Sequence, residues 1–96
     1  MKKYESVVLL KPDLNEKETK NIIDKITDKM KEYVNVTDFE DLGIRKLAYE
    51  IRKNKEGHYL VYQFEKEEIN NNEILEIERF YRITEEIIKY IVVRKD

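Results

Sequence analysis

The sequence predicts an α+β fold in which two helices pack on one face of a four-stranded antiparallel sheet. Four segments have the alternating or continuously apolar pattern of β-strands. Two segments between them carry apolar residues at every third or fourth position, which is the period of a helix with one buried stripe. The resulting element order is β-α-β-β-α-β.

The first half of the chain begins with a strand and a helix. Lys3–Leu10 is the first predicted strand, and its last four residues are apolar on both faces, as in a central strand. After a Lys-Pro-Asp break, Asn15 and Glu18 have the spacing of an N-cap and its capping partner. The helix that follows has one apolar stripe, made by Ile22, Ile26, Met30 and Tyr33.

A long β-hairpin is predicted in the middle of the chain. Its first strand covers roughly Val34–Arg52, with an irregularity around Asp41–Gly43, because a glycine inside a strand indicates a bulge or a bend. Asn54–Gly57 is predicted to reverse the chain, and His58–Lys66, rich in Tyr and Phe, to return as the third strand.

The last third is predicted to form a helix and a final strand. Asn70–Asn72 supplies a cap, and the helix carries the stripe Ile74, Ile77 and Tyr81. A turn at Arg82–Glu85 leads to the strand Ile87–Arg94. With a right-handed crossover in each half, this order gives the ferredoxin-like split βαβ arrangement, with strands in spatial order 4-1-3-2. We expect residues 1–96 to form one domain.

Several segments also resemble one known family. The run Leu-Gly-Ile-Arg-Lys-Leu-Ala-Tyr at 42–49, followed by Ile51, is similar to the central signature of the bacterial small-subunit ribosomal protein S6 family. Met1–Glu5, Gly57–Gln63 and the segment from Arg82 to Val93 are similar to its N-terminus, third strand and last strand. The resemblance therefore covers nearly the whole chain.

The resemblance implies a function and a set of contacts. It implies a non-enzymatic structural constituent of the small ribosomal subunit. It also implies binding to the central domain of small-subunit ribosomal RNA jointly with ribosomal protein S18, which is basic in that family's complexes. Because the sequence ends at Asp96 without the acidic tail of some members, we expect no tail modification. The residues carried over as RNA-binding are Lys2, Lys3, Tyr4, Lys89 and Arg94.

Composition limits the ways in which the chain binds RNA. Nineteen basic and 21 acidic residues leave a net charge of −2. Non-specific affinity for nucleic acids grows with the number of phosphates that a basic surface neutralises, so this charge argues against an indiscriminate nucleic-acid binder. We therefore expect a local basic patch aided by a more basic partner. No cysteine, apolar signal segment or membrane-length apolar run is present, so we expect a cytoplasmic protein.

The sequence shows no pattern typical of catalysis or of cofactor binding. His58 is the only histidine and lies beside a predicted turn, where surface histidines are common, and Ser6 is the only serine and lies within a strand. No residues have metal-ligand spacing, and two glycines are too few for a phosphate-binding loop. We expect no enzyme activity, cofactor, metal or small-molecule substrate.

The basic residues of interest fall into two groups. Pairing of the first and last strands is expected to bring Lys2, Lys3 and Tyr4 beside Arg94, with Lys89 projecting from the open face of the sheet. Each lysine can also be read as a solubilising charge, and Tyr4 as the rim of the core. The second group lies on the hairpin and supplies candidate contacts to RNA or to a partner protein: Arg45, Lys46 and Arg52.

Two other functions remain alternatives at this point. A single-strand RNA-binding module of the RNP-motif type has the same topology, but it needs a basic residue where Glu56 opens the third-strand motif. A small-molecule regulatory domain or a dimeric enzyme also occurs on such folds, although the sequence has no polar constellation for a ligand.

Overall fold

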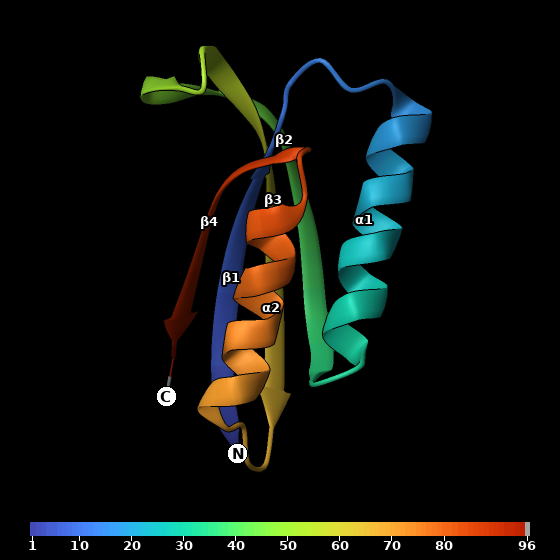
Figure 1. Cartoon of the computed structure of the whole chain (residues 1–96), viewed down its shortest axis with the longest axis vertical. Helices are drawn as coiled ribbons and strands as arrows, with labels where there is room; N and C mark the ends of the chain where they lie inside the picture. The colour runs from blue at the N-terminus through green and yellow to red at the C-terminus, as the bar shows by residue number, and fades with distance from the viewer. Residues whose placement is uncertain (96) are drawn as a thin grey trace.

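The computed structural model describes residues 1–95, so the expectation about the tail at Asp96 lies outside the described residues. Six elements follow one another in the predicted order (Figure 1). They are β1 (Lys2–Leu10), α1 (Glu16–Lys31), β2 (Asn35–Ile51), β3 (Asn54–Lys66), α2 (Asn71–Ile83) and β4 (Ile87–Arg94).

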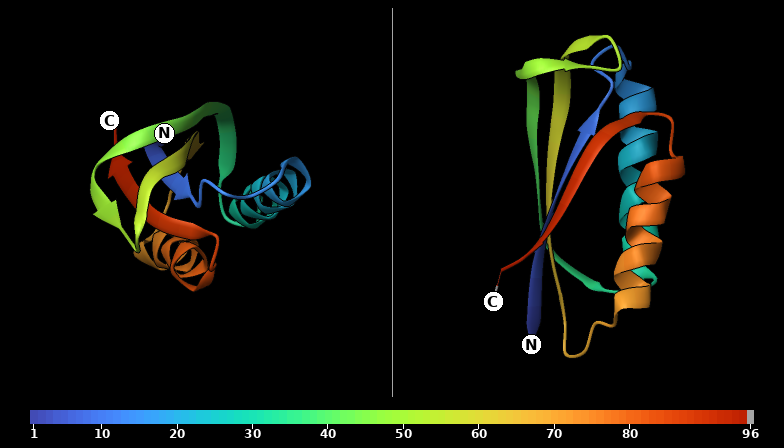
Figure 2. Two further views of the ribbon diagram at one scale, coloured as in Figure 1. Left: turned by 90° about the horizontal axis from the view of Figure 1, so that it is seen from above. Right: turned by 60° about the vertical axis from the view of Figure 1, so that its left-hand side comes forward.

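The four strands form one antiparallel sheet in the order β2-β3-β1-β4. This order is the predicted 4-1-3-2 arrangement read from the other edge, so the ferredoxin-like prediction is confirmed. Both helices cover the same face of the sheet and leave the other face open (Figure 2). The strands β1 and β3 are central, whereas β2 and β4 form the two edges.

Both helices begin at the predicted caps. Asn15 accepts a hydrogen bond from the Glu18 backbone N–H at 2.8 Å, and the Glu18 carboxylate accepts one from the Asn15 N–H at 3.1 Å. The same reciprocal arrangement joins Asn70 and Glu73 at the start of α2, at 2.9 and 3.2 Å. Each capping box satisfies two backbone donors that an α-helix otherwise leaves without partners.

The hydrophobic core lies between the helices and the inner face of the sheet. The predicted stripes point into it, because Ile22, Ile26 and Met30 of α1 and Ile77 and Tyr81 of α2 are buried. The sheet contributes alternate residues of its central strands, as expected for strands with one covered face. These are Val8 and Leu10 of β1 and Leu60, Tyr62 and Phe64 of β3.

Two tyrosine hydroxyls inside the core have hydrogen-bond partners. Tyr81 shares a hydrogen bond of 2.8 Å with Ser6, and Tyr62 shares one of 3.0 Å with Thr27. Burial raises the pKa of Tyr62 to about 12 and raises the pKa of Tyr81 further. Both phenols are therefore neutral at physiological pH and act only as hydrogen-bonding groups.

The β2–β3 hairpin contains the predicted irregularity and one misplaced turn. Gly43 has φ of +77°, and the register with β3 shifts between Asp41 and Gly43, which confirms the bulge. The reversal predicted at Asn54–Gly57 is wrong, because the chain turns at Arg52 and Lys53, with φ of +48° and +65°. The side chain of Asn54 stabilises this two-residue turn by donating to the carbonyls of Ile51 and Arg52.

The end of this hairpin bends away from the line of the sheet (Figure 1). Lys46 pairs with Glu56, whereas Ile51 pairs with Asn54, so β2 has three more residues than β3 in this interval. The extra length lets residues 46–55 fold towards β4. We call residues 46–55 the hairpin arm.

Candidate nucleic-acid interface

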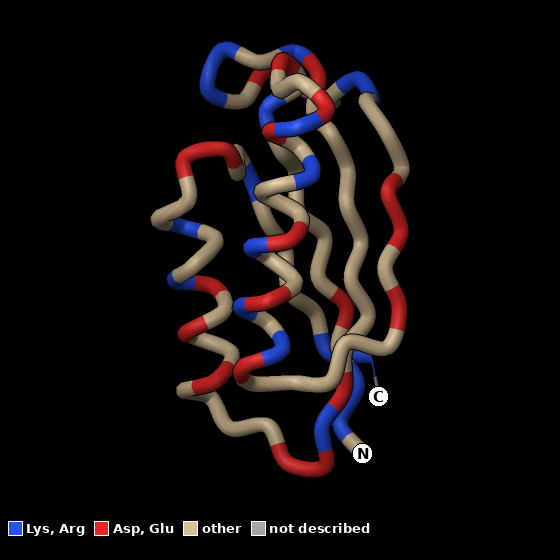
Figure 3. Tube along the Cα trace, turned by 90° about the vertical axis from the view of Figure 1, so that its right-hand side faces the viewer, with Lys and Arg blue, Asp and Glu red and all other residues tan. Residues whose placement is uncertain are grey.

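Basic residues from both ends of the chain meet at one end of the sheet. Tyr4 pairs with Arg94, and the Lys95 backbone N–H donates to the Lys3 carbonyl at 2.8 Å. Figure 3 shows the basic segments at the two termini close together. We call the group formed by Lys2, Lys3, Tyr4 and Arg94 the terminal corner.

Tyr4 lies at the rim of the core within the terminal corner. Its ring is stacked on Phe64 with centroids 5.5 Å apart and planes 7° apart, and it packs against the core cluster. Tyr4 therefore occupies the rim of the core, as in the alternative interpretation of this residue from the sequence. The ring remains partly exposed, with one face committed to Phe64.

Acidic and amide side chains adjoin the terminal corner on the open face. Gln63 donates to the Glu5 carboxylate at 2.6 Å, and the Lys95 ammonium lies 3.9 Å from the same carboxylate. Lys66, which pairs with Lys2 across the sheet, forms an ion pair with Glu73 of α2. Among residues 1–95, no carboxylate lies within ion-pair distance of Lys2 or Lys3.

Lys89 does not belong to the terminal corner, contrary to the grouping made from the sequence. Its register partner on β1 is Leu9, five residues from Tyr4 along the strand. At a rise of about 3.3 Å per residue, this places Lys89 roughly 16 Å from the corner. It does lie on the open face as predicted, because Tyr90 and Val92 between Lys89, Ile91 and Val93 pack against the core.

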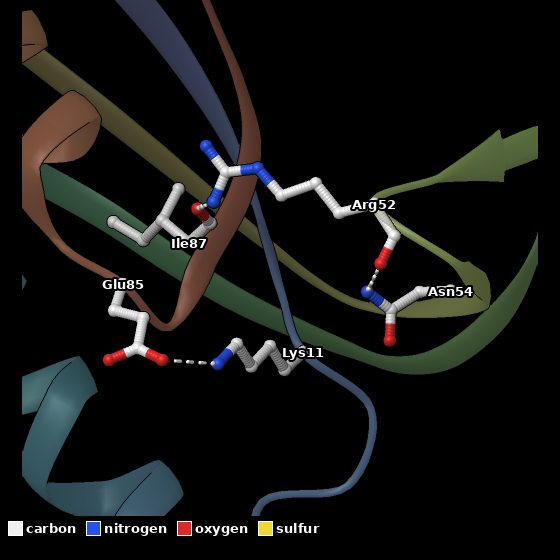
Figure 4. A network of polar contacts seen from close by, with 5 residues as sticks. All are labelled: Lys11, Arg52, Asn54, Glu85 and Ile87. Carbon is white, nitrogen blue, oxygen red and sulfur yellow. Dashed lines mark hydrogen bonds and ion pairs between the residues drawn. The ribbon is translucent and has the colours of Figure 1, made fainter.

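The hairpin arm is attached to β4 by apolar and polar contacts. A Cβ added to Gly57 would lie 3.4 Å from Leu47, 3.5 Å from Leu9 and 3.7 Å from Ile88, so these three side chains converge over the glycine. The Arg52 guanidinium donates to the Ile87 carbonyl at 3.4 Å (Figure 4). The arm therefore has a defined position over the end of β4.

A third contact joins the hairpin arm to Lys89. The Lys89 ammonium donates to the Tyr49 hydroxyl at 3.0 Å and lies 5.3 Å from the centre of the ring. The hydrogen bond and the positive charge of Lys89 lower the pKa of Tyr49. Sequence reasoning missed this contact, because the two residues are 40 positions apart and meet only through the bend of the arm.

The other candidate cations have different roles. Arg52 anchors the arm, and the Arg45 side chain donates to the Leu42 carbonyl at 3.4 Å, next to the bulge. Lys46 is exposed at the base of the arm. His58 lies 2.6 Å from the Asp41 carboxylate, which also accepts from the Gly43 N–H, so this histidine supports the bulge.

The open face of the sheet carries exposed apolar residues on one edge strand and acidic residues on the other. Ile91 and Val93 on β4 are 46% and 43% exposed. Asp38 and Glu40 line the same face on the edge strand β2, and both are exposed. One row of neighbours crosses all four strands, in the order Glu40, Val61, Val7 and Ile91.

The described residues form neither a metal-binding cluster nor a membrane-spanning helix. Within 1–95, no group of three or more acidic or histidine side chains is arranged to hold a metal ion. None of the helices in this part of the chain is long and apolar enough to cross a membrane. The chemistry that remains is that of charged, aromatic and apolar surfaces.

Comparison with known proteins places the sequence and the fold in one family. The family model described as ribosomal protein S6 matches residues 3–94. Small ribosomal subunit protein bS6 of Caldanaerobacter subterraneus is 38% identical, and the match covers 100% of this chain and 99% of that protein. The bS6 protein of Helicobacter acinonychis is 40% identical over 100% of this chain, which spans only 66% of the relative's length.

A solved structure agrees with these sequence matches. The crystal structure of 30S ribosomal protein S6 from Thermotoga maritima superposes with a TM-score of 0.89 at 33% identity, covering 98% of this chain and 87% of that one. Small-subunit ribosomal proteins of bacteria are cytoplasmic, as expected from the sequence. With a family match over nearly its whole length, the chain belongs to the ribosomal protein S6 family of the small ribosomal subunit.

Proposed function

We propose that this protein is a non-catalytic structural component that binds the central domain of small-subunit ribosomal RNA together with ribosomal protein S18. The observation that carries the proposal is the separation of charge on the sheet. Cations gather at the terminal corner, whereas Asp38 and Glu40 lie on the edge strand β2. Lys3 and Asp38 line one hollow, so RNA and a basic protein would bind neighbouring parts of the sheet.

The terminal corner supports the RNA part of the proposal. Lys2, Lys3 and Arg94 come from neighbouring ends of paired strands, and several nearby cations are what adjacent phosphates require. Lysine makes a point contact to a phosphate, whereas arginine binds it through two parallel hydrogen bonds. We therefore expect individual contacts at Lys2 and Lys3 to be modest and additive.

The open face and the β2 edge support the protein part. An edge strand offers unpaired backbone groups, and the exposed Ile91 and Val93 offer apolar area for a partner. Asp38 and Glu40, at the opposite edge of the same face, complement a basic chain such as S18. A partner that covers this face would add its own positive charge to the RNA-binding surface.

Titration of a central-domain RNA fragment with and without S18 tests the proposal. The net charge of −2 limits unaided attraction to phosphates, so we expect tight binding only when S18 is present. Equal affinities in the two titrations would contradict joint binding. In a second titration without RNA, Glu40→Lys is expected to weaken S18 binding, whereas Asp28→Lys, an equal charge change on the exposed side of α1, is not.

A further inference from the structure

The strongest unexplained feature is an exposed aromatic ring that is held in place. Tyr49 is 64% exposed, so its ring adds little to the core. Its hydroxyl is nevertheless fixed by Lys89, and the arm that carries it is fixed by Arg52 and Leu47. A rigid, exposed aromatic side chain beside a cation is the combination that single-stranded nucleic acids recognise.

We propose that Tyr49 and Lys89 form one site for an unpaired RNA nucleotide, in which the base stacks on Tyr49 and a phosphate binds Lys89. The inference rests on the proposed function, because it assumes that the chain binds RNA, and it adds Tyr49 to the residues involved. The site lies at the opposite end of β4 from the terminal corner.

The Lys89 ammonium lies at the hydroxyl end of the ring. It is 3.0 Å from the Tyr49 hydroxyl and 5.3 Å from the ring centre, so it lies beyond the ring edge and leaves the exposed ring face to a stacking base. The Lys89 ammonium has three N–H donors. One donates to the Tyr49 hydroxyl, and the other two can donate to a phosphate oxygen. Tyr49 thus holds Lys89 in place without exhausting its hydrogen-bonding capacity.

The charges around the ring favour Lys89 as the phosphate contact. Lys46 and Lys55 line a shallow groove with Tyr49, but Glu50 and Glu56 line it too, so the charges of the groove itself cancel. Lys89 has a hydroxyl, not a carboxylate, as its hydrogen-bond partner. Its positive charge is therefore available to a phosphate.

Affinity for RNA tests the stacking contact. In the presence of S18, Tyr49→Leu is expected to weaken binding of the central-domain fragment by roughly 5- to 100-fold, as loss of one stacked base does. Tyr49→Phe keeps the ring and is expected to stay within about threefold of the wild type. The control is Tyr33→Leu, because Tyr33 also lies near a lysine, with Lys29 Nζ 5.4 Å from its ring centre. Since Tyr33 packs partly against the core, urea unfolding must show that this variant is folded, and its RNA affinity is then expected to stay that of the wild type.

Two further readouts separate stacking from a general structural effect. Lys89→Ala is expected to flatten the salt dependence by about one unit of log–log slope, whereas Tyr49→Leu leaves the slope unchanged. Since the chain has no tryptophan, Tyr49→Trp introduces a single tryptophan, whose fluorescence can be excited separately from that of the tyrosines. The emission of this tryptophan is expected to be quenched when RNA binds the complex with S18. In a Tyr33→Trp variant, RNA binding is expected to leave the emission unchanged.

Three results would overturn the proposal. The first is that Tyr49→Leu binds RNA as tightly as the wild type does. The second is that Tyr49→Leu binds S18 more weakly in the absence of RNA, which would assign Tyr49 to the protein partner. Both leave the proposed function intact. The third is the absence of any RNA binding by the wild-type chain with S18, which contradicts the proposed function and this site together.

Discussion

The hydroxyl of Ser6 on β1 lies 2.8 Å from the hydroxyl of Tyr81 on α2, and this hydrogen bond joins the sheet to a helix inside the core. Both side chains are fully buried. The Tyr81 hydroxyl also lies 3.6 Å from the sulfur of Met30, a weak acceptor on α1. The three residues link both helices to the central strand.

Removing one partner of this hydrogen bond is expected to destabilise the fold. Ser6→Ala leaves the Tyr81 hydroxyl with only the sulfur as a partner, and the expected loss of unfolding free energy is about 1–3 kcal/mol. Urea denaturation measures it. The double variant Ser6→Ala with Tyr81→Phe is expected to lose less than the sum of the two single variants, because neither hydroxyl is then left alone. Strict additivity would show that the hydroxyls do not interact.

Truncation of Ile26 tests the position of the core. Ile26 on α1 has no exposed surface, so Ile26→Ala is expected to cost about 2–5 kcal/mol of unfolding free energy. Leu75→Ala on α2 is the control, because Leu75 is 57% exposed, and its effect is expected to stay within about 0.5 kcal/mol. Thermal or urea unfolding measures both losses. Similar losses in the two variants would show that the buried face of the helices has been assigned wrongly.

Ionisation of the buried tyrosines is expected to weaken the fold at high pH. Burial holds the pKa of Tyr62 at about 12 in the folded chain, whereas an unfolded tyrosine loses its proton near pH 10. Between about pH 10 and pH 12 the unfolded state therefore binds fewer protons, so the unfolding free energy falls as the pH rises.

The Tyr62→Phe variant separates this effect from the titration of other groups. It lacks the ionisation, so its unfolding free energy is expected to fall less steeply than that of the wild type over the same pH range. Urea denaturation at a series of alkaline pH values measures both curves. Parallel curves would show that Tyr62 ionises alike in the folded and unfolded states.

Local sequence signals were sufficient for the elements and the core. The capping residues Asn15 and Asn70 and the stripes of both helices depend on spacings of three or four residues, which the sequence displays directly. The bulge at Gly43 likewise follows from one glycine in an alternating strand. Each of these features is decided by neighbours along the chain.

The features that were missed depend on contacts between distant segments. Asn and Gly favour turns and so predict the reversal at Asn54–Gly57, yet Arg52 and Lys53 adopt the left-handed conformation instead. Gly57 lies within β3 instead, and a Cβ there would be in van der Waals contact with Leu47 and Leu9. The bend of the arm, and with it the contact between Tyr49 and Lys89, follows from a register shift that no local pattern reveals.

Loss of the corner lysines tests where RNA binds. Lys2→Ala combined with Lys3→Ala is expected to weaken RNA binding in the presence of S18 and to lower the log–log salt slope by about one unit per lost phosphate contact. Stability is expected to change by no more than about 0.5 kcal/mol per substitution, because neither lysine is buried. Filter binding at several salt concentrations measures the slope.

The control for this variant removes the same charge from another surface. Lys17 and Lys25 are exposed on α1, and replacing both with alanine also removes two positive charges. If the effect of the corner lysines came only from net charge, the two double variants would lose the same affinity and the same slope. The Lys2 and Lys3 variant is expected to lose more affinity and more slope. A lysine releases counterions condensed on the RNA only where it contacts a phosphate. Equal losses in the two double variants would contradict the assignment of RNA binding to the terminal corner.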